Sequence, residues 1–238
     1  MSTSGVTTYN VTRDQIINGA LRIIGAIAQG ESPTATQTTE AAEALNLMVK
    51  AWEADGNQLW GMTEYSMSLT ADTATYNIGV GQTINIPRPV RVIRAHNHTI
   101  STGVDVPMRL LTREQYNALG NKTTSGNPIQ FYYDPQVAYG VLKLFPVPDA
   151  TLAASQQIIL VYQRPFEDFV NSGDNPDFPQ EWMEALKYGL AVRLASEYGL
   201  SLEQRQILRK EAEEVKTLAL QNGIEEGSTY FQVDRRSW

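Results

Sequence analysis

The chain of 238 residues contains no cysteine. Disulfide bonds, thiolate chemistry and zinc sites built on cysteine are therefore excluded. Histidine occurs only at His96 and His98. No apolar run approaches the roughly 18 residues that a membrane-spanning helix needs, so we expect no membrane partner. The first ten residues have neither a basic region nor an apolar stretch, and we expect no secretory signal.

The chain also lacks an excess of basic residues in any segment. Its 19 Lys and Arg are outnumbered by 26 Asp and Glu, which gives a formal net charge of −7. A tight nucleic-acid binder needs basic side chains to neutralise phosphates, so this class is excluded. The length allows one large domain or two small ones.

Helical periodicity marks both ends of the chain. At the N-terminal end, Thr12 to Gln15 forms a capping box, and apolar residues follow at helical spacing until Gly30, a suitable C-terminal stop. A second helix begins near Thr34 or Thr36 and stops at Asp55-Gly56. At the C-terminal end, Ser201 to Gln204 is another capping box, whose helix runs to Asn222-Gly223.

The segment from Pro179 to Tyr198 is too apolar for a surface helix. Pro179 suits the first helical position, and the Glu181 carboxylate lies in the first turn, where the helix dipole stabilises a negative charge. The apolar residues that follow cover far more of the helix surface than the single stripe of a surface helix. We assign Trp182 and Leu186 to the core of the same subunit. Such a helix must be covered on more than one side, by its own domain or by a neighbouring copy. We assign three smaller residues off the main stripe to an inter-subunit face: Gly189, Val192 and Ala195.

The middle of the chain changes to a period of two residues, which is typical of strands. Short apolar runs alternate with turns rich in Pro and Gly, and Thr112 to Gln115 begins a short capped helix. The strand candidates lie at 65–69, 76–78, 83–86, 90–99, 106–111, 129–133, 140–145 and 157–163.

These patterns predict an α+β fold. Residues 1–60 and 176–223 form a four-helix bundle, and residues 61–175 form an inserted antiparallel β-sandwich or barrel. Residues 224–238 show no helical period and form an extended C-terminal tail. This tail contains the aromatic, apolar and Arg residues that commonly anchor interfaces: Tyr230, Phe231, Val233, Arg235, Arg236 and Trp238. We expect it to order on a partner.

Motifs for catalysis are weak. His96 and His98 would face the same side of a strand, but no spacing indicates a third metal ligand, so no metal site is predicted. Gly79-Val80-Gly81 lacks the following helix of a phosphate-binding turn and is interpreted as a tight turn. The loop carboxylates Glu167-Asp168 and Asp174 to Asp177 could form a glycosidase-type acid/base pair, but the sequence establishes neither their separation nor a raised pKa.

Two groups of charged residues have ordinary surface interpretations. The first is the solvated face of the last helix, with a ring of charges at a subunit contact or channel as the alternative: Arg205, Arg209, Lys210, Glu211, Glu213 and Glu214. The second consists of Arg88, Arg91 and Arg94, interpreted as surface charges on an edge strand, with contacts to DNA phosphates or acidic partners as the alternative.

Several stretches together resemble the head-to-tail adaptor proteins of short-tailed phages, also called packaged-DNA stabilisation proteins or tail tubular protein A. The resemblance covers most of the chain. It rests on A-L-R-I-I-G at 20–25, A-L-N-L-M-V-K-A-W-E-A-D-G at 44–56, P-I-Q-F-Y-Y at 128–133, L-K-L-F-P-V-P-D at 142–149, V-Y-Q-R-P-F at 161–166 and P-D-F-P-Q-E-W-M-E-A-L at 176–186.

The resemblance implies a homo-oligomeric ring, commonly a dodecamer, attached beneath the portal protein of a DNA-filled head. In that family the helical part packs around the ring, the C-terminal segment docks on the portal, and the β part faces the next tail or nozzle protein. Packaged DNA would pass through without sequence-specific binding, which the acidic balance favours. The protein would reside in the virion at the head-tail junction, and in the host cytoplasm during assembly.

The leading hypothesis is therefore a non-enzymatic structural adaptor without cofactor or metal. One alternative is a virion-associated peptidoglycan hydrolase that uses the loop carboxylates Glu167, Asp168 and Asp174. Another is a head-completion connector of a long-tailed phage, a smaller helical fold that the strand-rich middle of this chain disfavours.

Overall fold

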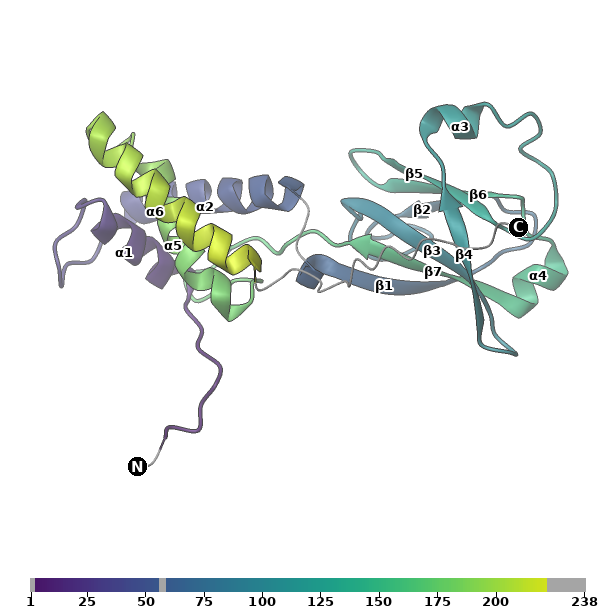
Figure 1. Ribbon diagram of the computed structural model, residues 1–238, viewed down its shortest axis with the longest axis horizontal. Helices are drawn as coiled ribbons and strands as arrows, with labels where there is room; N and C mark the ends of the chain where they lie inside the picture. The colour runs from purple at the N-terminus through teal and green to yellow at the C-terminus, as the bar shows by residue number, and fades with distance from the viewer. Residues whose placement is uncertain (1–2, 56–58, 222–238) are drawn as a thin grey trace, which may run out of the picture. The chain divides into compact units, whose positions relative to one another are not determined.

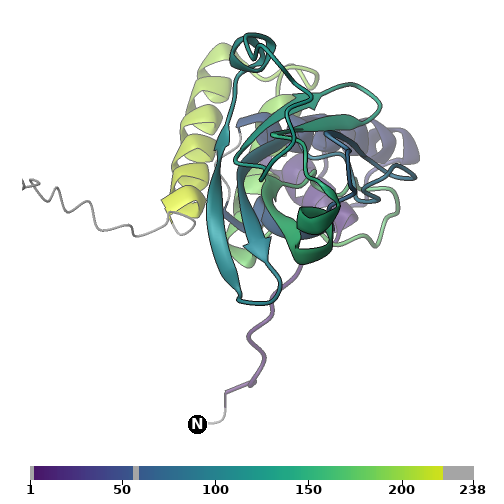
Figure 2. The same ribbon diagram turned by 90° about the vertical axis from the view of Figure 1, so that its right-hand side faces the viewer.

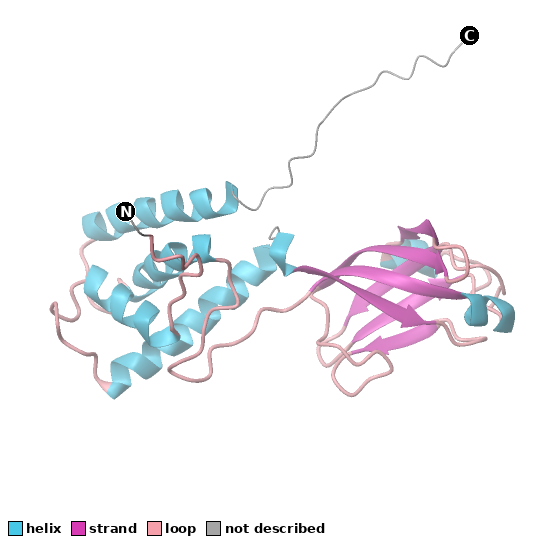
Figure 3. Cartoon of the chain, turned by 90° about the horizontal axis from the view of Figure 1, so that it is seen from below, coloured by secondary structure: helices cyan, strands magenta, loops and turns pink. Residues whose placement is uncertain are grey.

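The computed structural model describes residues 3–55 and 59–221, which form two compact units (Figure 1). Unit 1 contains the described residues up to Leu45, Leu59, and those from Phe169 on. Unit 2 contains Asn46 to Asp55 and Trp60–Asp168. Helices dominate unit 1 and strands dominate unit 2 (Figure 3). Within the described ranges, no helix has the length and apolar character needed to cross a membrane.

Unit 1 is built on four α-helices and one short 3₁₀ turn. These are α1 (Arg13–Ile23), the first half of α2 (Ala35–Asp55), η2 (Gln180–Trp182), α5 (Met183–Leu194) and α6 (Leu202–Gln221). Helix α5 packs against both α1 and α6. The fold is thus α+β as predicted, whereas a four-helix bundle remains a prediction.

Helix α5 is buried around much of its circumference, as its composition predicts. Trp182 and Leu186 are buried, which confirms their assignment to the core, and so are Leu190, Ala191 and Leu194. Because α1 and α6 lie against this helix, its own unit supplies much of the cover that the apolar sequence demands.

The ends of two helices differ from the prediction. Helix α1 stops at Ile23 rather than near Gly30, because Gly25 adopts a left-handed conformation (φ +73°). The Ala26 N–H then donates to the Leu21 carbonyl at 2.9 Å, and the Gly25 N–H donates to the Arg22 carbonyl at 3.1 Å. These two bonds form a Schellman motif, which glycine favours because it has no Cβ.

Pro179 also lies one position earlier than expected. It is the extended N-cap residue of the 3₁₀ turn η2, not the first residue of a continuous α-helix. Helix α5 follows η2 and ends at Leu194, before Tyr198. The two capping boxes are confirmed: Thr12 pairs with Gln15, and Ser201 and Gln204 exchange the same pair of hydrogen bonds. The predicted stop at Asn222-Gly223 lies outside the described residues.

Unit 2 contains one curled sheet of seven strands, half of a barrel (Figure 2). The strands are β1 (Met62–Ser68), β2 (Thr75–Ile78), β3 (Arg91–Thr99), β4 (Val104–Leu110), β5 (Gln130–Pro135), β6 (Gly140–Phe145) and β7 (Gln156–Gln163). Their order is β1-β7-β3-β4-β5-β6-β2. The short elements η1 (Leu59–Gly61), α3 (Arg113–Asn117) and α4 (Ala150–Ser155) complete the described elements.

The sheet differs in two respects from the expected antiparallel sandwich or barrel. It is a single curled layer, and the β4–β5 pair is parallel. Its concave face carries one core of aromatic and aliphatic side chains, including Phe131, Leu142, Leu144 and Leu160. Curling lets one sheet enclose its own apolar face, which a flat sheet cannot do.

Two short segments of unit 2 were predicted incorrectly. Residues 83–86 do not form a strand: Ile84 makes only an isolated bridge with Ile78. Helix α4 was not predicted. Its N-cap signal is nevertheless present in the sequence, since the Asp149 carboxylate accepts a hydrogen bond from the Leu152 N–H at 2.8 Å. The short helix α3 is confirmed, with Thr112 and Gln115 forming its capping box.

Candidate interaction surfaces

The predicted portal-binding tail lies outside the described residues. Tyr230, Phe231, Val233, Arg235, Arg236 and Trp238 all follow Gln221, the last described position. Their assignment therefore stays a prediction.

The three residues assigned to an inter-subunit face have different surroundings on α5. Ala195 is only 1% exposed within its own chain, so it offers almost no surface to a second copy. Gly189 and Val192 are partly exposed. The contact of all three residues with a neighbouring copy stays a prediction, although Ala195, the C-cap residue of α5, exposes much less surface than the other two.

The acidic side chain of Asp168 has a structural partner. It forms an ion pair with Lys50 on α2 at 2.9 Å, and the same ammonium donates to the Phe166 carbonyl at 2.7 Å. The Glu53 carboxylate accepts from the Phe166 N–H at 2.8 Å. Partial burial lowers the pKa of Lys50, but the Asp168 and Glu53 carboxylates outweigh this, so its pKa is raised. This network secures the segment after β7 to the end of α2 within unit 2.

Asp174 likewise stabilises a turn. Its carboxylate accepts from the backbone N–H of Asn171 at 2.6 Å and of Val170 at 2.7 Å. These bonds lower the pKa of Asp174. A general acid requires a raised pKa, so this environment is opposite to the one that the hydrolase hypothesis needs.

The two histidines lie two residues apart on β3, so their side chains share one face of the sheet. His98 pairs across the strands with Asp105, with Nδ1 and Oδ1 2.6 Å apart, and His96 lies opposite Pro107. Over residues 3–55 and 59–221 no group of three or more potential metal-ligating side chains gathers. The observed arrangement is a cross-strand polar pair.

Gly79 and Gly81 form a tight turn, as predicted. The Gln82 N–H donates to the Gly79 carbonyl at 3.0 Å, and Gly81 has φ +75°. Asn85 accepts the Gly81 N–H, which leaves this group bonded within the turn. The local hydrogen bonds therefore account for both glycines without a phosphate.

The charged residues of α6 form an exposed face. Lys210 and Glu214 are 3.9 Å apart at i,i+4 spacing, an exposed pair that adds little stability. Strand β3 is an inner strand of the sheet, between β7 and β4, but its pairing with β4 covers only Ala95–Thr99, so Arg91 and Arg94 pair with β7 alone. Both are exposed, and the Arg91 Nε donates to the Gln163 side chain at 2.8 Å.

Two apolar residues of α6 are exposed although each lies next to a buried residue of the same helix. Ile207 is 56% exposed and Leu218 is 62% exposed, whereas Leu208 and Ala219 are buried. Among the described elements, the close contacts of α6 are with α5 and η2. The helix therefore buries only a narrow stripe of its surface. The broader apolar pattern in the sequence therefore includes surface residues.

A groove lies between the end of α1 and the beginning of α6. Its lining includes Ile23, Ile24, Leu200, Ile207 and Leu208, and it encloses about 410 Å³. Polar side chains also line it, namely Arg22, Gln204 and Glu211. Such a mixture of apolar and polar side chains is common in protein–protein interfaces. The sequence signal was the pair of adjacent apolar residues Ile207-Leu208, of which α6 buries only Leu208.

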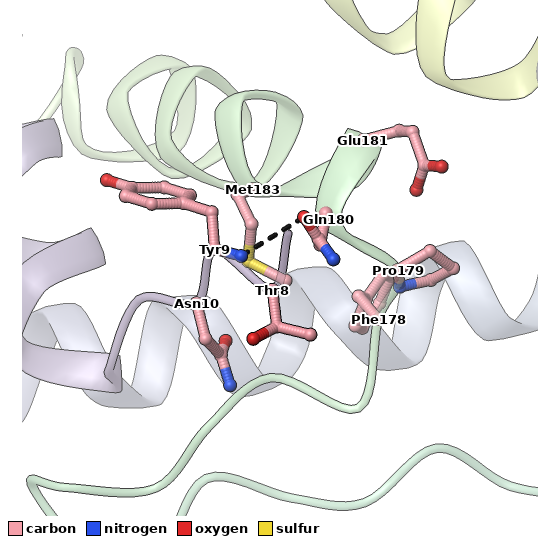
Figure 4. A pocket seen from close by; sticks show the side chains of 8 residues that line it. All are labelled: Thr8, Tyr9, Asn10, Phe178, Pro179, Gln180, Glu181 and Met183. Carbon is pink, nitrogen blue, oxygen red and sulfur yellow. Dashed lines mark hydrogen bonds between the residues drawn. The ribbon is translucent and has the colours of Figure 1, made fainter. Parts of the chain in front are cut away.

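A second feature of unit 1 is the extended N-terminal arm, residues 3–10. Every residue of the arm is exposed. Tyr9 anchors it near η2, where its N–H donates to the Gln180 Oε1 at 3.1 Å (Figure 4). The surrounding pocket encloses about 340 Å³, and its lining includes Phe178, Glu181 and Met183. The arm therefore has one defined point of attachment and an otherwise uncovered surface.

Comparison with known protein families places this chain among phage adaptor proteins. The chain belongs to the SU10 adaptor protein family, whose model matches residues 11–236. None of the curated proteins matches it. Family membership thus makes this protein a phage adaptor, a structural class of protein.

Proposed function

We propose that this protein is the head-to-tail adaptor of a short-tailed phage. Copies assemble into a ring between the portal and the tail, close the DNA-filled head, and provide a conduit for DNA ejection. The role is non-enzymatic and needs neither cofactor nor metal. The ring resides at the head-tail junction of the virion.

The observation that carries this proposal is the family match over residues 11–236, which spans both units. The chemistry of the loop carboxylates supports it, because Asp168 and Asp174 are engaged in structural bonds. The net charge of −7 also suits a channel wall, since a negatively charged protein does not grip the DNA backbone.

Each part of the chain has a distinct task in this proposal. The helical unit contacts neighbouring copies, with Gly189 and Val192 on the contact face. The β unit faces the next tail protein. The tail, residues 224–238, docks on the portal through its aromatic and Arg residues, and its ordering cost is met only on docking.

The test is a mass measurement in solution. The full chain is examined by native mass spectrometry and sedimentation, alone and with purified portal. We expect a closed ring, alone or on the portal. A variant that ends at Gln221 should keep the fold of the described residues and lose portal binding.

A full chain that stays monomeric and never binds the portal at assembly concentrations would overturn the proposal. If the variant ending at Gln221 binds the portal as tightly as the full chain, the ring role stands and the tail assignment is wrong.

A further inference from the structure

We propose that the N-terminal arm of one copy docks in the α1–α6 groove of a neighbouring copy. The arm is residues 3–10, and the groove is the one lined by Ile23, Ile24, Leu200, Ile207 and Leu208. Adjacent copies are then connected by exchanged arms in addition to helix contacts. This inference rests on the proposed ring.

The arm has the properties of a segment that completes its packing on another molecule. Val6 is 71% exposed and Tyr9 is 68% exposed. No charged side chain occurs between Met1 and Thr12, so transfer of the arm into an apolar groove removes no charged side chain from water. Val, Thr and Tyr also favour the extended backbone that the arm adopts.

The groove offers the arm an exposed apolar surface. Five aliphatic side chains are part of its lining, and one of them, Ile207, is 56% exposed in the single copy. A volume of about 410 Å³ accommodates a few side chains, not a folded domain.

The arm does not occupy the groove of its own copy: every residue from 3 to 10 is exposed, and none of them lines the groove. Tyr9 is held at η2 through its bond to Gln180, whereas the groove begins where α1 ends. Val6 is three residues from Tyr9 and can lie at most about 11 Å from it. Figure 1 shows the arm leading away from the end of unit 1 where α1 stops and α6 starts.

The free side of β4 is a poorer receptor for the arm. Residues 104–108 pair with β3, and β5 pairs only with Arg109 and Leu110, so one side of this stretch is open. Pro107 lies in its middle and has no N–H to donate, and proline is a common protection of strand edges. We therefore assign the arm to the groove.

The absence of cysteine makes a direct test available, because introduced thiols are the only ones present. The variants Val6→Cys and Ile207→Cys are mixed as full chains at ring-forming concentration and oxidised. We expect a disulfide-linked pair of chains on a non-reducing gel. The effective concentration of a docked arm raises its yield about a hundredfold or more over free encounter.

The matched control is Val6→Cys mixed with Val137→Cys, since Val137 is almost fully exposed but lies in unit 2. This pair should give only background cross-linking. The single chain carrying both Val6→Cys and Ile207→Cys, oxidised at high dilution, should not close on itself. The mixture should still cross-link when both chains end at Gln221, which separates arm docking from the tail.

Three outcomes overturn the inference. One is a ring of normal mass in which the mixed pair cross-links no better than the control, which leaves the proposed function intact. Another is efficient closure within one diluted chain, which makes the groove a receptor for its own arm. The third is cross-linking of Val6→Cys to a cysteine-bearing portal instead of to Ile207→Cys. A chain that forms no ring removes both proposals.

Discussion

At the scale of single residues, Gly140 shows how one missing side chain shapes the β unit. It is buried on β6, and an added Cβ there would overlap the ring and hydroxyl of Tyr133. The Tyr133 hydroxyl donates to the Pro89 carbonyl at 2.7 Å, and burial raises the pKa of Tyr133 to about 12. The Tyr133 side chain is therefore fixed by its burial and by this hydrogen bond, and it cannot easily move to make room for a Cβ at position 140.

We predict that Gly140→Ala destabilises the protein by about 1–3 kcal/mol, the usual cost of overpacking a core. The matched comparison is Gly19→Ala on α1, where the three atoms nearest to an added Cβ are methylene carbons of the Lys187 side chain, which must move. Alanine favours a helix by about 1 kcal/mol over glycine, which offsets this movement, so Gly19→Ala should be less destabilising than Gly140→Ala. Urea unfolding measures both, and equal stabilities for the two variants would contradict the argument.

At the scale of elements, α1 shows how a helix start combines local and distant partners. Its cap is local, because Thr12 accepts from the Gln15 N–H. The preceding donors are satisfied from far along the chain: the Arg13 N–H donates to the Asp174 carbonyl at 2.8 Å, and the Asp14 N–H donates to the Ser172 carbonyl at 3.4 Å. Asp174 folds the turn that presents these carbonyls.

We predict that Asp174→Ala lowers the melting temperature at neutral pH, because both the turn and the start of α1 lose support. The folded-state pKa of Asp174 is lowered from 3.8, so its stabilisation is present above that value and is lost as the pH falls through the folded pKa. The melting temperatures of variant and wild type should thus converge in acid. Glu197→Ala, which removes another exposed carboxylate of unit 1, is the control. A difference that does not change with pH would show that the charge of Asp174 is irrelevant.

Element types followed from periodicity, whereas element ends often did not. The capping boxes at Thr12, Thr112 and Ser201 were predictable because their partners lie three residues away. The end of α1 at Gly25 instead of Gly30 was not predictable. Ile27 and Ala28 continue the helical period, and both glycines can adopt the left-handed conformation that ends a helix. Residues 83–86 alternate like a strand but have only an isolated bridge.

At the scale of the whole molecule, α5 determines how much apolar surface is left for assembly. Leu190 is fully buried within the chain, and Val192, two residues later, is partly exposed. The two residues belong to one helix and differ mainly in the direction they face. Their substitution therefore separates folding from assembly.

We predict that Val192→Glu prevents or weakens ring formation while the monomer keeps its melting temperature within a few degrees. Leu190→Glu, in contrast, places an unpaired charge in the core and should unfold the protein. Sedimentation reports assembly, and circular dichroism reports folding. A ring of normal stability with Val192→Glu would exclude this position from the subunit contact.

The sequence by itself determined the α+β class, the helical ends and strand-rich middle, the main caps and the excess apolar surface of 179–198, because each depends on near neighbours along the chain. Its ordered motifs resembled phage head-to-tail adaptors, and the chain belongs to a phage adaptor family. Only the tertiary structure decided which apolar residues are covered: Ala195 is buried, Ile207 is exposed, and Asp168 and Asp174 are used for structural bonds. The physical reason is that burial and pairing depend on partners distant in sequence, and periodicity carries no information about those partners.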